Sequence, residues 1–128
     1  MNNSKILVVD DERDLREALK TSLEEAGYEV LTANDGGEGL RAALANKPDL
    51  IVLDIQMPHM NGHQMLHELR KDVWGMKVPV LMLTNADDAT NITQGVEQRS
   101  NDYIIKTQIS LAEVAKKVKQ YLAGYHHS

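Results

Sequence analysis

The stretch Pro48-Asp49-Leu50-Ile51-Val52-Leu53-Asp54-Ile55-Gln56-Met57-Pro58 decides the fold. Its centre, Leu50–Leu53, is apolar without polar alternation, which is typical of a strand buried on both faces of a parallel sheet. Four further apolar runs have the length of strands, and three of these are equally rich in Val, Ile or Leu. In chain order, the five predicted strands are Ile6–Val9, Tyr28–Ala33, Leu50–Leu53, Val78–Leu83 and Tyr103–Ile105.

Segments with helical spacing separate these runs. Leu15, Leu19 and Leu23 recur every four residues, and Gly27 is expected to end that helix. Further helices are predicted around Leu40–Leu44 before Asn46-Lys47-Pro48, around Met65–Leu69 with Asn61 as N-cap, more weakly over Asp88–Gln98, and from a Ser110–Glu113 capping box to Gly124. Strand and helix thus alternate five times, which predicts a doubly wound α/β domain with five helices on the two faces of a parallel sheet.

Composition narrows the function classes. A chain of 128 residues suits one domain, assigned to residues 4–124, and residues 125–128 look like a tail of the kind an expression tag leaves. The net charge of −5 and the lack of a basic run speak against nucleic acid binding within this chain. There are no cysteines and no apolar run near the roughly 20 residues of a membrane span. We therefore expect a cytoplasmic domain without membrane contact.

Polar side chains follow the predicted strands where each strand ends. Asp10 and Asp11 follow the first strand, Asp54 ends the third, Thr84 ends the fourth and Lys106 follows the fifth. Singly, each has a plain structural explanation, such as a helix N-cap or a solvated lysine. Together they place three carboxylates at one edge of the sheet, where ligands bind in such folds and where the charges need a cation. Mg²⁺ fits, because it prefers oxygen ligands and often binds one or two carboxylates plus a phosphoryl oxygen.

In this order the motifs resemble the receiver domains of two-component response regulators, of the single-domain chemotaxis-regulator kind. Gly62, eight residues after Asp54, fits as well, and the resemblance runs from about Lys5 to Ala123. It implies a flavodoxin-like fold with strand order 2-1-3-4-5. The stretches that carry it are Ile6-Leu7-Val8-Val9-Asp10-Asp11-Glu12, Pro48 to Pro58, Pro79-Val80-Leu81-Met82-Leu83-Thr84 and Asp102-Tyr103-Ile104-Ile105-Lys106.

The resemblance also implies residue roles. Asp54 is the expected phosphoacceptor, and Asp10, Asp11, Asp54 and the backbone carbonyl of Gln56 are the expected Mg²⁺ site. Thr84 and Lys106 are expected to contact the phosphoryl group, and Thr84 and Tyr103 to form the switch. The partners implied are a sensor histidine kinase or a histidine phosphotransfer protein and a downstream protein. Such a domain is a signalling switch that catalyses only its own phosphorylation and dephosphorylation and changes the surface of the fourth helix, fifth strand and fifth helix.

Two places depart from the family pattern. Thr107 stands where a proline normally follows the lysine, and Arg99 and Ser100 replace a Gly-Ala pair; Asn85 is also larger than usual. Three alternative functions compete with this one: a phosphohydrolase with Asp10 as nucleophile and Glu12 nearby, an interaction module that is not phosphorylated, and a flavin-binding module. Among other features, His59, His63 and His67 are interpreted as a solvated face rather than a metal site, and Trp74 as a loop anchor.

Overall fold

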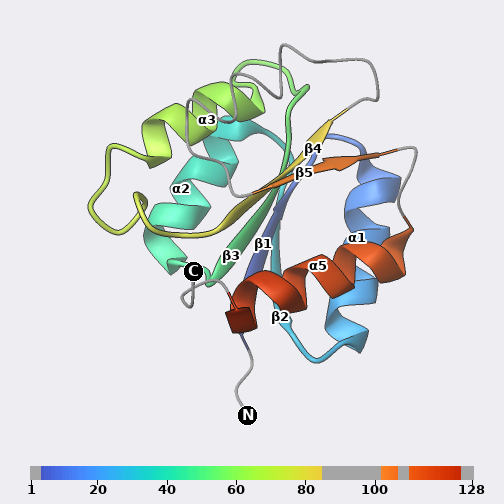
Figure 1. Cartoon of the computed structure of the whole chain (residues 1–128). Coiled ribbons are helices and arrows are strands. Elements are labelled where there is room, and N and C mark those ends of the chain that lie inside the picture. Colours follow the sequence, from blue (N-terminus) through green and yellow to red (C-terminus); the bar gives the residue numbers. More distant parts are fainter. Residues whose placement is uncertain (1–3, 85–101, 107–109, 125–128) are drawn as a thin grey trace.

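A single parallel sheet organises the domain (Figure 1). The computed structural model describes residues 4–84, 102–106 and 110–124. Five strands form the sheet in the order β2-β1-β3-β4-β5, which confirms the predicted topology. Their bounds differ from the predicted runs by no more than two residues: β1 Lys5–Val9, β2 Glu29–Ala33, β3 Leu50–Asp54, β4 Val80–Thr84 and β5 Asp102–Ile105.

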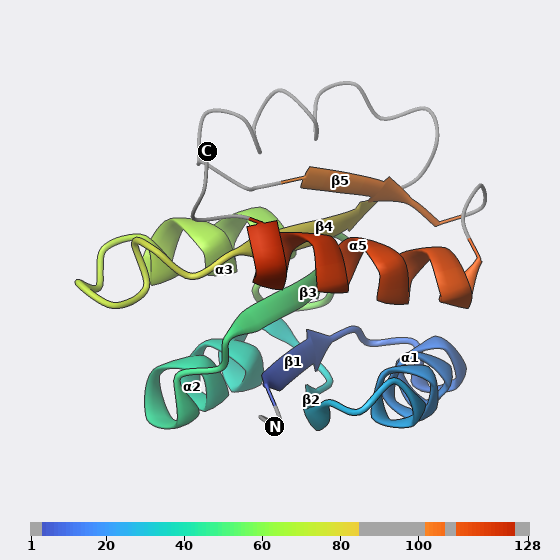
Figure 2. The same ribbon diagram turned by 60° about the horizontal axis from the view of Figure 1, so that its bottom comes forward.

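Helices cover both faces of this sheet. Helices α1 and α5 lie on one side of it, and α2 and α3 lie on the other, as the two views show (Figures 1 and 2). The helix predicted over residues 88–98 lies outside the described residues. The four described helices are α1 Arg13–Glu25, α2 Gly36–Asn46, α3 Gly62–Leu69 and α5 Leu111–Gly124.

The core consists of two apolar layers, one on each side of the sheet. Alternate residues of a strand point to opposite faces, so Val9 and Leu53 pack toward α2 and α3, while Val8 and Val52 pack toward α1 and α5. All four side chains are fully buried. This two-sided burial explains why the strands are uniformly apolar in sequence. It also leaves the strand ends as the place where polar groups can approach the sheet.

The helix boundaries follow the expected chemistry. Gly27 adopts a φ of 101° after α1, a conformation that suits glycine. Asn61 caps α3, because its side chain accepts from the Gln64 N–H at 2.9 Å. The Gln64 side chain in turn accepts from the Asn61 N–H. Ser110 and Glu113 form the predicted capping box at α5. No helix within the described ranges is long and apolar enough to cross a membrane.

Strand register brings the polar residues of four strands to one edge. Val9 pairs with Leu53, so the residues that follow and end these strands, Asp10 and Asp54, come to the same level. The Lys106 N–H donates to the Thr84 carbonyl at 2.9 Å, which ties the residue after β5 to the end of β4. The carboxyl ends of the central strands therefore build the candidate site.

Candidate functional site

Three aspartates converge at the end of the sheet. Asp10, Asp11 and Asp54 each place a carboxylate oxygen within 4.8 Å of the others, the only such acidic or histidine group found in the described ranges. Asp54 is 2 % exposed and Asp10 is fully buried, whereas Asp11 faces solvent. The predicted gathering of carboxylates is therefore present, and its inner members are shielded from water.

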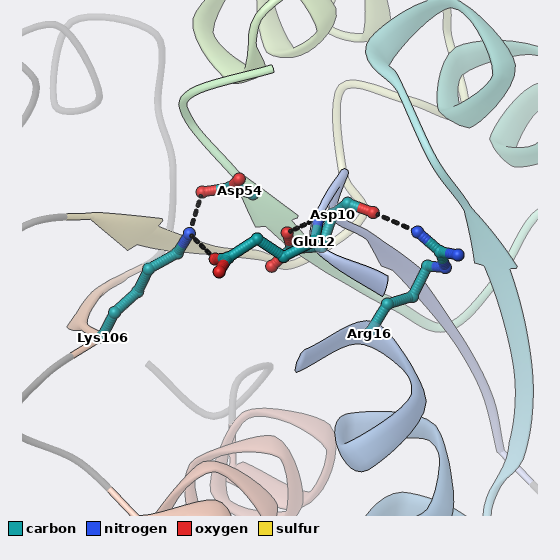
Figure 3. A network of polar contacts seen from close by, with 5 residues as sticks. All are labelled: Asp10, Glu12, Arg16, Asp54 and Lys106. Carbon is teal, nitrogen blue, oxygen red and sulfur yellow. Dashed lines mark hydrogen bonds and ion pairs between the residues drawn. The ribbon is translucent and has the colours of Figure 1, made fainter. Parts of the chain in front are cut away.

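Lys106, the residue after β5, supplies a positive charge to this cluster. The Nζ of Lys106 lies 2.9 Å from Oδ1 of Asp54 and 3.3 Å from Oε1 of Glu12 (Figure 3). The Lys106 side chain is 18 % exposed, so it stands at the mouth of the site with its ammonium directed inward. A cation in this position neutralises the negative charge of the Asp54 carboxylate and of any anionic group attached to it.

Burial controls the electrostatics of the cluster. Loss of hydration raises the pKa of Asp54 to about 7, against the opposing effect of the Lys106 hydrogen bond, and the neighbouring Asp10 carboxylate adds to the rise. Burial also raises the pKa of Asp10. For Lys106, burial alone would lower the pKa, but the Asp54 carboxylate outweighs it and raises that pKa. Lys106 thus stays charged. Its single positive charge is not enough to offset the cost of burying both the Asp10 and the Asp54 carboxylates.

Asp10 also holds the turn after β1. Oδ1 of Asp10 accepts from the Glu12 N–H at 2.8 Å, and Nη1 of Arg16 donates to the Asp10 carbonyl at 2.9 Å (Figure 3). Asp10 therefore holds the turn ahead of α1 with one of its oxygens, but the N-cap residue of that helix is Glu12. The backbone of the turn is fixed by these bonds, and the Asp10 carboxylate is fixed with it.

The donor set fits a hard divalent cation. Oδ2 of Asp10 and Oδ2 of Asp54 are both buried and have no hydrogen-bond partner among the described residues. Buried carboxylate oxygens without partners are costly, and a cation with oxygen ligands would satisfy both. Exposed Asp11 completes the group from the side open to water, which suits an ion such as Mg²⁺ that retains several waters.

One glycine lets the chain pass close to the end of β3. A Cβ on Gly62 would stand 2.4 Å from the carbonyl oxygen of Asp54 and 2.8 Å from Cα of Ile55. The Gly62 N–H donates to the Ile55 carbonyl at 2.8 Å, so the chain returns to the strand end before α3 begins. This close approach gives a physical reason for glycine eight residues after Asp54.

The remaining predicted residues have the following places. Thr84 ends β4 and is 2 % exposed, and Tyr103 in β5 is half-buried against the layer of core under α2 and α3. Gln56 is exposed just beyond Asp54, and a role for its carbonyl stays a prediction. Asn85, Arg99, Ser100 and Thr107, which depart from the family pattern, lie outside the described residues.

Two expectations away from the site have different outcomes. Trp74 is half-buried and packs against the core, as expected of a loop anchor. The solvated histidine face is wrong for His63, which is 5 % exposed, although His59 and His67 are exposed. The reason is the packing of α3 on the sheet, which buries His63 together with Leu66, three residues further along the same side of the helix.

Sequence reasoning overlooked the contact of Glu12 with Lys106. These residues are 94 positions apart, and Glu12, although part of the stretch that carries the resemblance, had an expected role only in the phosphohydrolase alternative. The available signal was an acidic residue directly after the two aspartates, at the start of the first helix. The structure adds that this carboxylate reaches across to the end of β5.

Comparison with known proteins gives the following similarities. Residues 6–119 match the family model of the response regulator receiver domain. The alkaline phosphatase synthesis transcriptional regulatory protein PhoP of Bacillus subtilis is 42 % identical over 120 residues, which are 94 % of this chain and 49 % of that protein. This chain therefore spans about half the length of such curated relatives.

Solved structures agree with that result. The chemotaxis protein CheY4 of Vibrio cholerae superposes with a TM-score of 0.87 at 29 % identity, covering 93 % of this chain and 98 % of that one. The receiver domain of the sensor histidine kinase PA1611 from Pseudomonas aeruginosa has a TM-score of 0.86 at 25 % identity, covering 94 % and 98 %. That structure has a magnesium ion coordinated in its active site cleft.

Proposed function

Because the chain belongs to the response regulator receiver domain family, we propose that residues 4–124 form a switch phosphorylated on Asp54. The observation that carries this proposal is the buried Asp54 carboxylate, paired with Lys106 and lying within 4.8 Å of two further aspartates. No other described acidic side chain both pairs with a cation and belongs to a candidate metal site.

The chemistry follows from these positions. An oxygen of Asp54 forms a bond to phosphorus, the bond from phosphorus to the donor breaks, and the leaving group keeps the electron pair. Such transfers depend mainly on in-line positioning and on neutralising the charge of the phosphoryl oxygens. Lys106 provides a positive charge 2.9 Å from the reacting carboxylate. The buried Thr84 hydroxyl, at the end of the neighbouring strand, is the proposed partner of a phosphoryl oxygen.

Mg²⁺ is the proposed cofactor. Asp10, Asp11 and Asp54 would hold it, together with the Gln56 carbonyl, and when bound it supplies positive charge that stabilises the ionised carboxylates and the phosphoryl oxygens. The partnerless Oδ2 atoms of Asp10 and Asp54 support this assignment. The pKa of about 7 for Asp54 describes the site without a metal, and a nearby dication lowers it.

The proposed donor is a sensor histidine kinase or a histidine phosphotransfer protein, and the proposed output is binding of a downstream protein. An aspartyl phosphate is a mixed anhydride that water can hydrolyse, so the signal is erasable and the domain acts on itself alone. The phosphohydrolase alternative is less well supported, because Lys106 pairs with Asp54 rather than with Asp10, and one oxygen of Asp10 already accepts from the Glu12 N–H.

The test is intact mass spectrometry after incubation with phosphoramidate, with Mg²⁺ or with EDTA. We expect a single adduct of about 80 Da in the presence of Mg²⁺. Asp54→Asn should abolish it, whereas Asp49→Asn, at the opposite end of β3, should retain it. An undiminished adduct in Asp54→Asn would show that another residue is the acceptor.

A further inference from the structure

The Lys106 ammonium has two carboxylate partners, of which only one belongs to the proposed phosphoacceptor. Its Nζ lies 2.9 Å from Asp54 and 3.3 Å from Oε1 of Glu12 (Figure 3). Asp54 is almost fully buried, whereas 64 % of the Glu12 side chain is exposed. The ammonium therefore stands between an inner carboxylate and an outer one that can leave it without disturbing the core.

We propose that the Glu12 carboxylate is an internal competitor of the phosphoryl group for Lys106. The inference rests on the proposed function of Asp54 and adds a feature that limits the rate of its phosphorylation. A phosphoryl group on Asp54 extends from a buried carboxylate toward the open side of the site, which is the side from which Glu12 reaches the lysine. A carboxylate and a phosphoryl group are both anions that accept from an ammonium. Glu12 therefore occupies, in the resting domain, a contact that the phosphoryl group needs.

Hydrogen bonds of the turn after β1 fix the backbone of Glu12. Its backbone N–H donates to Oδ1 of Asp10 at 2.8 Å, and Arg16 donates to the Asp10 carbonyl at 2.9 Å. Glu12 is also the N-cap residue of α1, although its side chain forms no capping hydrogen bond. The side chain therefore starts from a fixed backbone and is directed to Lys106 instead of to its own helix.

Glu12 takes no part in the bonds that change. With phosphoramidate as donor, an Asp54 oxygen bonds to phosphorus, the phosphorus–nitrogen bond breaks, and ammonia leaves with the electron pair. Lys106 must at the same time exchange Glu12 for a phosphoryl oxygen. An interaction that is lost on the way to the transition state slows the reaction by its own strength. For an exposed ion pair this corresponds to about two- to five-fold in rate.

The test compares initial rates of Asp54 phosphorylation by phosphoramidate with Mg²⁺ at low ionic strength. Glu12→Gln should react about two- to five-fold faster than the wild type, and the difference should shrink at high salt. Glu12→Asp keeps the charge but is one methylene shorter, so it should also be faster if contact with Lys106 matters. Glu25→Gln changes the net charge equally at the far end of α1 and is the matched control.

A second readout separates this inference from the proposed function. Glu12→Gln should bind beryllofluoride, a phosphoryl mimic, about two- to five-fold more tightly with Mg²⁺, as measured by amide NMR titration. An equal or lower rate and affinity in Glu12→Gln would overturn the competition, and so would wild-type behaviour of Glu12→Asp. Absence of an Asp54 adduct in every variant would instead count against the proposed function, while the ratio of beryllofluoride affinities would still decide the role of Glu12.

Discussion

Replacement of Asp54 by Asn should stabilise the metal-free domain, and more so as the pH rises. Burial raises the pKa of this carboxyl to about 7 in the folded domain, whereas its ordinary value, which the unfolded chain has, is 3.8. The stability that its protonated form contributes is fully present below about pH 4 and is lost as the pH rises through about 7. Asn stays neutral throughout, so the variant avoids that loss.

The size of the effect follows from the same shift. A rise from 3.8 to about 7 corresponds to an upper limit of about 4 kcal/mol, at 1.36 kcal/mol for each pKa unit. Loss of the charged contact with Lys106 and relaxation of the site reduce this limit. We expect the free energy of unfolding of Asp54→Asn to exceed that of the wild type by about 2–4 kcal/mol at pH 8, and by much less at pH 4.5.

Urea denaturation in EDTA measures this difference. Trp74 is the single tryptophan of the chain and packs against the core, so its fluorescence reports unfolding away from the substituted residue. Asp14→Asn, which removes an exposed carboxylate from the first turn of α1, controls for the change in net charge. A stability difference between Asp54→Asn and the wild type that is the same at both pH values would refute the account of the buried charge.

Three further perturbations test other parts of the site. Asp11→Ala should weaken Mg²⁺ binding about tenfold while the domain stays folded, and an unchanged affinity in an NMR titration would exclude Asp11 as a ligand. Gly62→Ala should lower the free energy of unfolding by about 1–3 kcal/mol, because its Cβ meets the Asp54 carbonyl at 2.4 Å; a urea curve that superposes on the wild type would contradict this. Thr84→Ala should still accept a phosphoryl group, but its Tyr103 amide should shift less with beryllofluoride and Mg²⁺ than in the wild type, and equal shifts would argue against the proposed coupling.

Much of the fold was predictable because its strands are buried on both faces. Such burial demands unbroken apolar runs, so Leu50–Leu53 and its counterparts stand out from the amphipathic helices between them. The convergence of Asp10, Asp54 and Lys106 was equally predictable, since parallel strands bring their carboxyl ends to one edge of the sheet.

Other features depend on contacts that no local pattern encodes. The burial of His63 results from the way α3 packs on the sheet, because its spacing from Leu66 alone does not show that a polar side chain is buried there. The contact of Glu12 with Lys106 joins the start of α1 to the end of β5 and requires both side chains to reach a common point. The pKa of about 7 for Asp54 likewise arises from burial beside Asp10, which only the assembled site produces.

The most direct test of the central claim is to identify the phosphorylated residue chemically. An aspartyl phosphate is reduced by borohydride to homoserine, whereas an unmodified aspartate is not. After treatment with phosphoramidate and Mg²⁺, reduction and proteolysis, peptide mass spectrometry should find homoserine at position 54, at the end of β3. Homoserine at position 10 or 11 instead, or at no aspartate of a domain that has gained the adduct, would contradict the account.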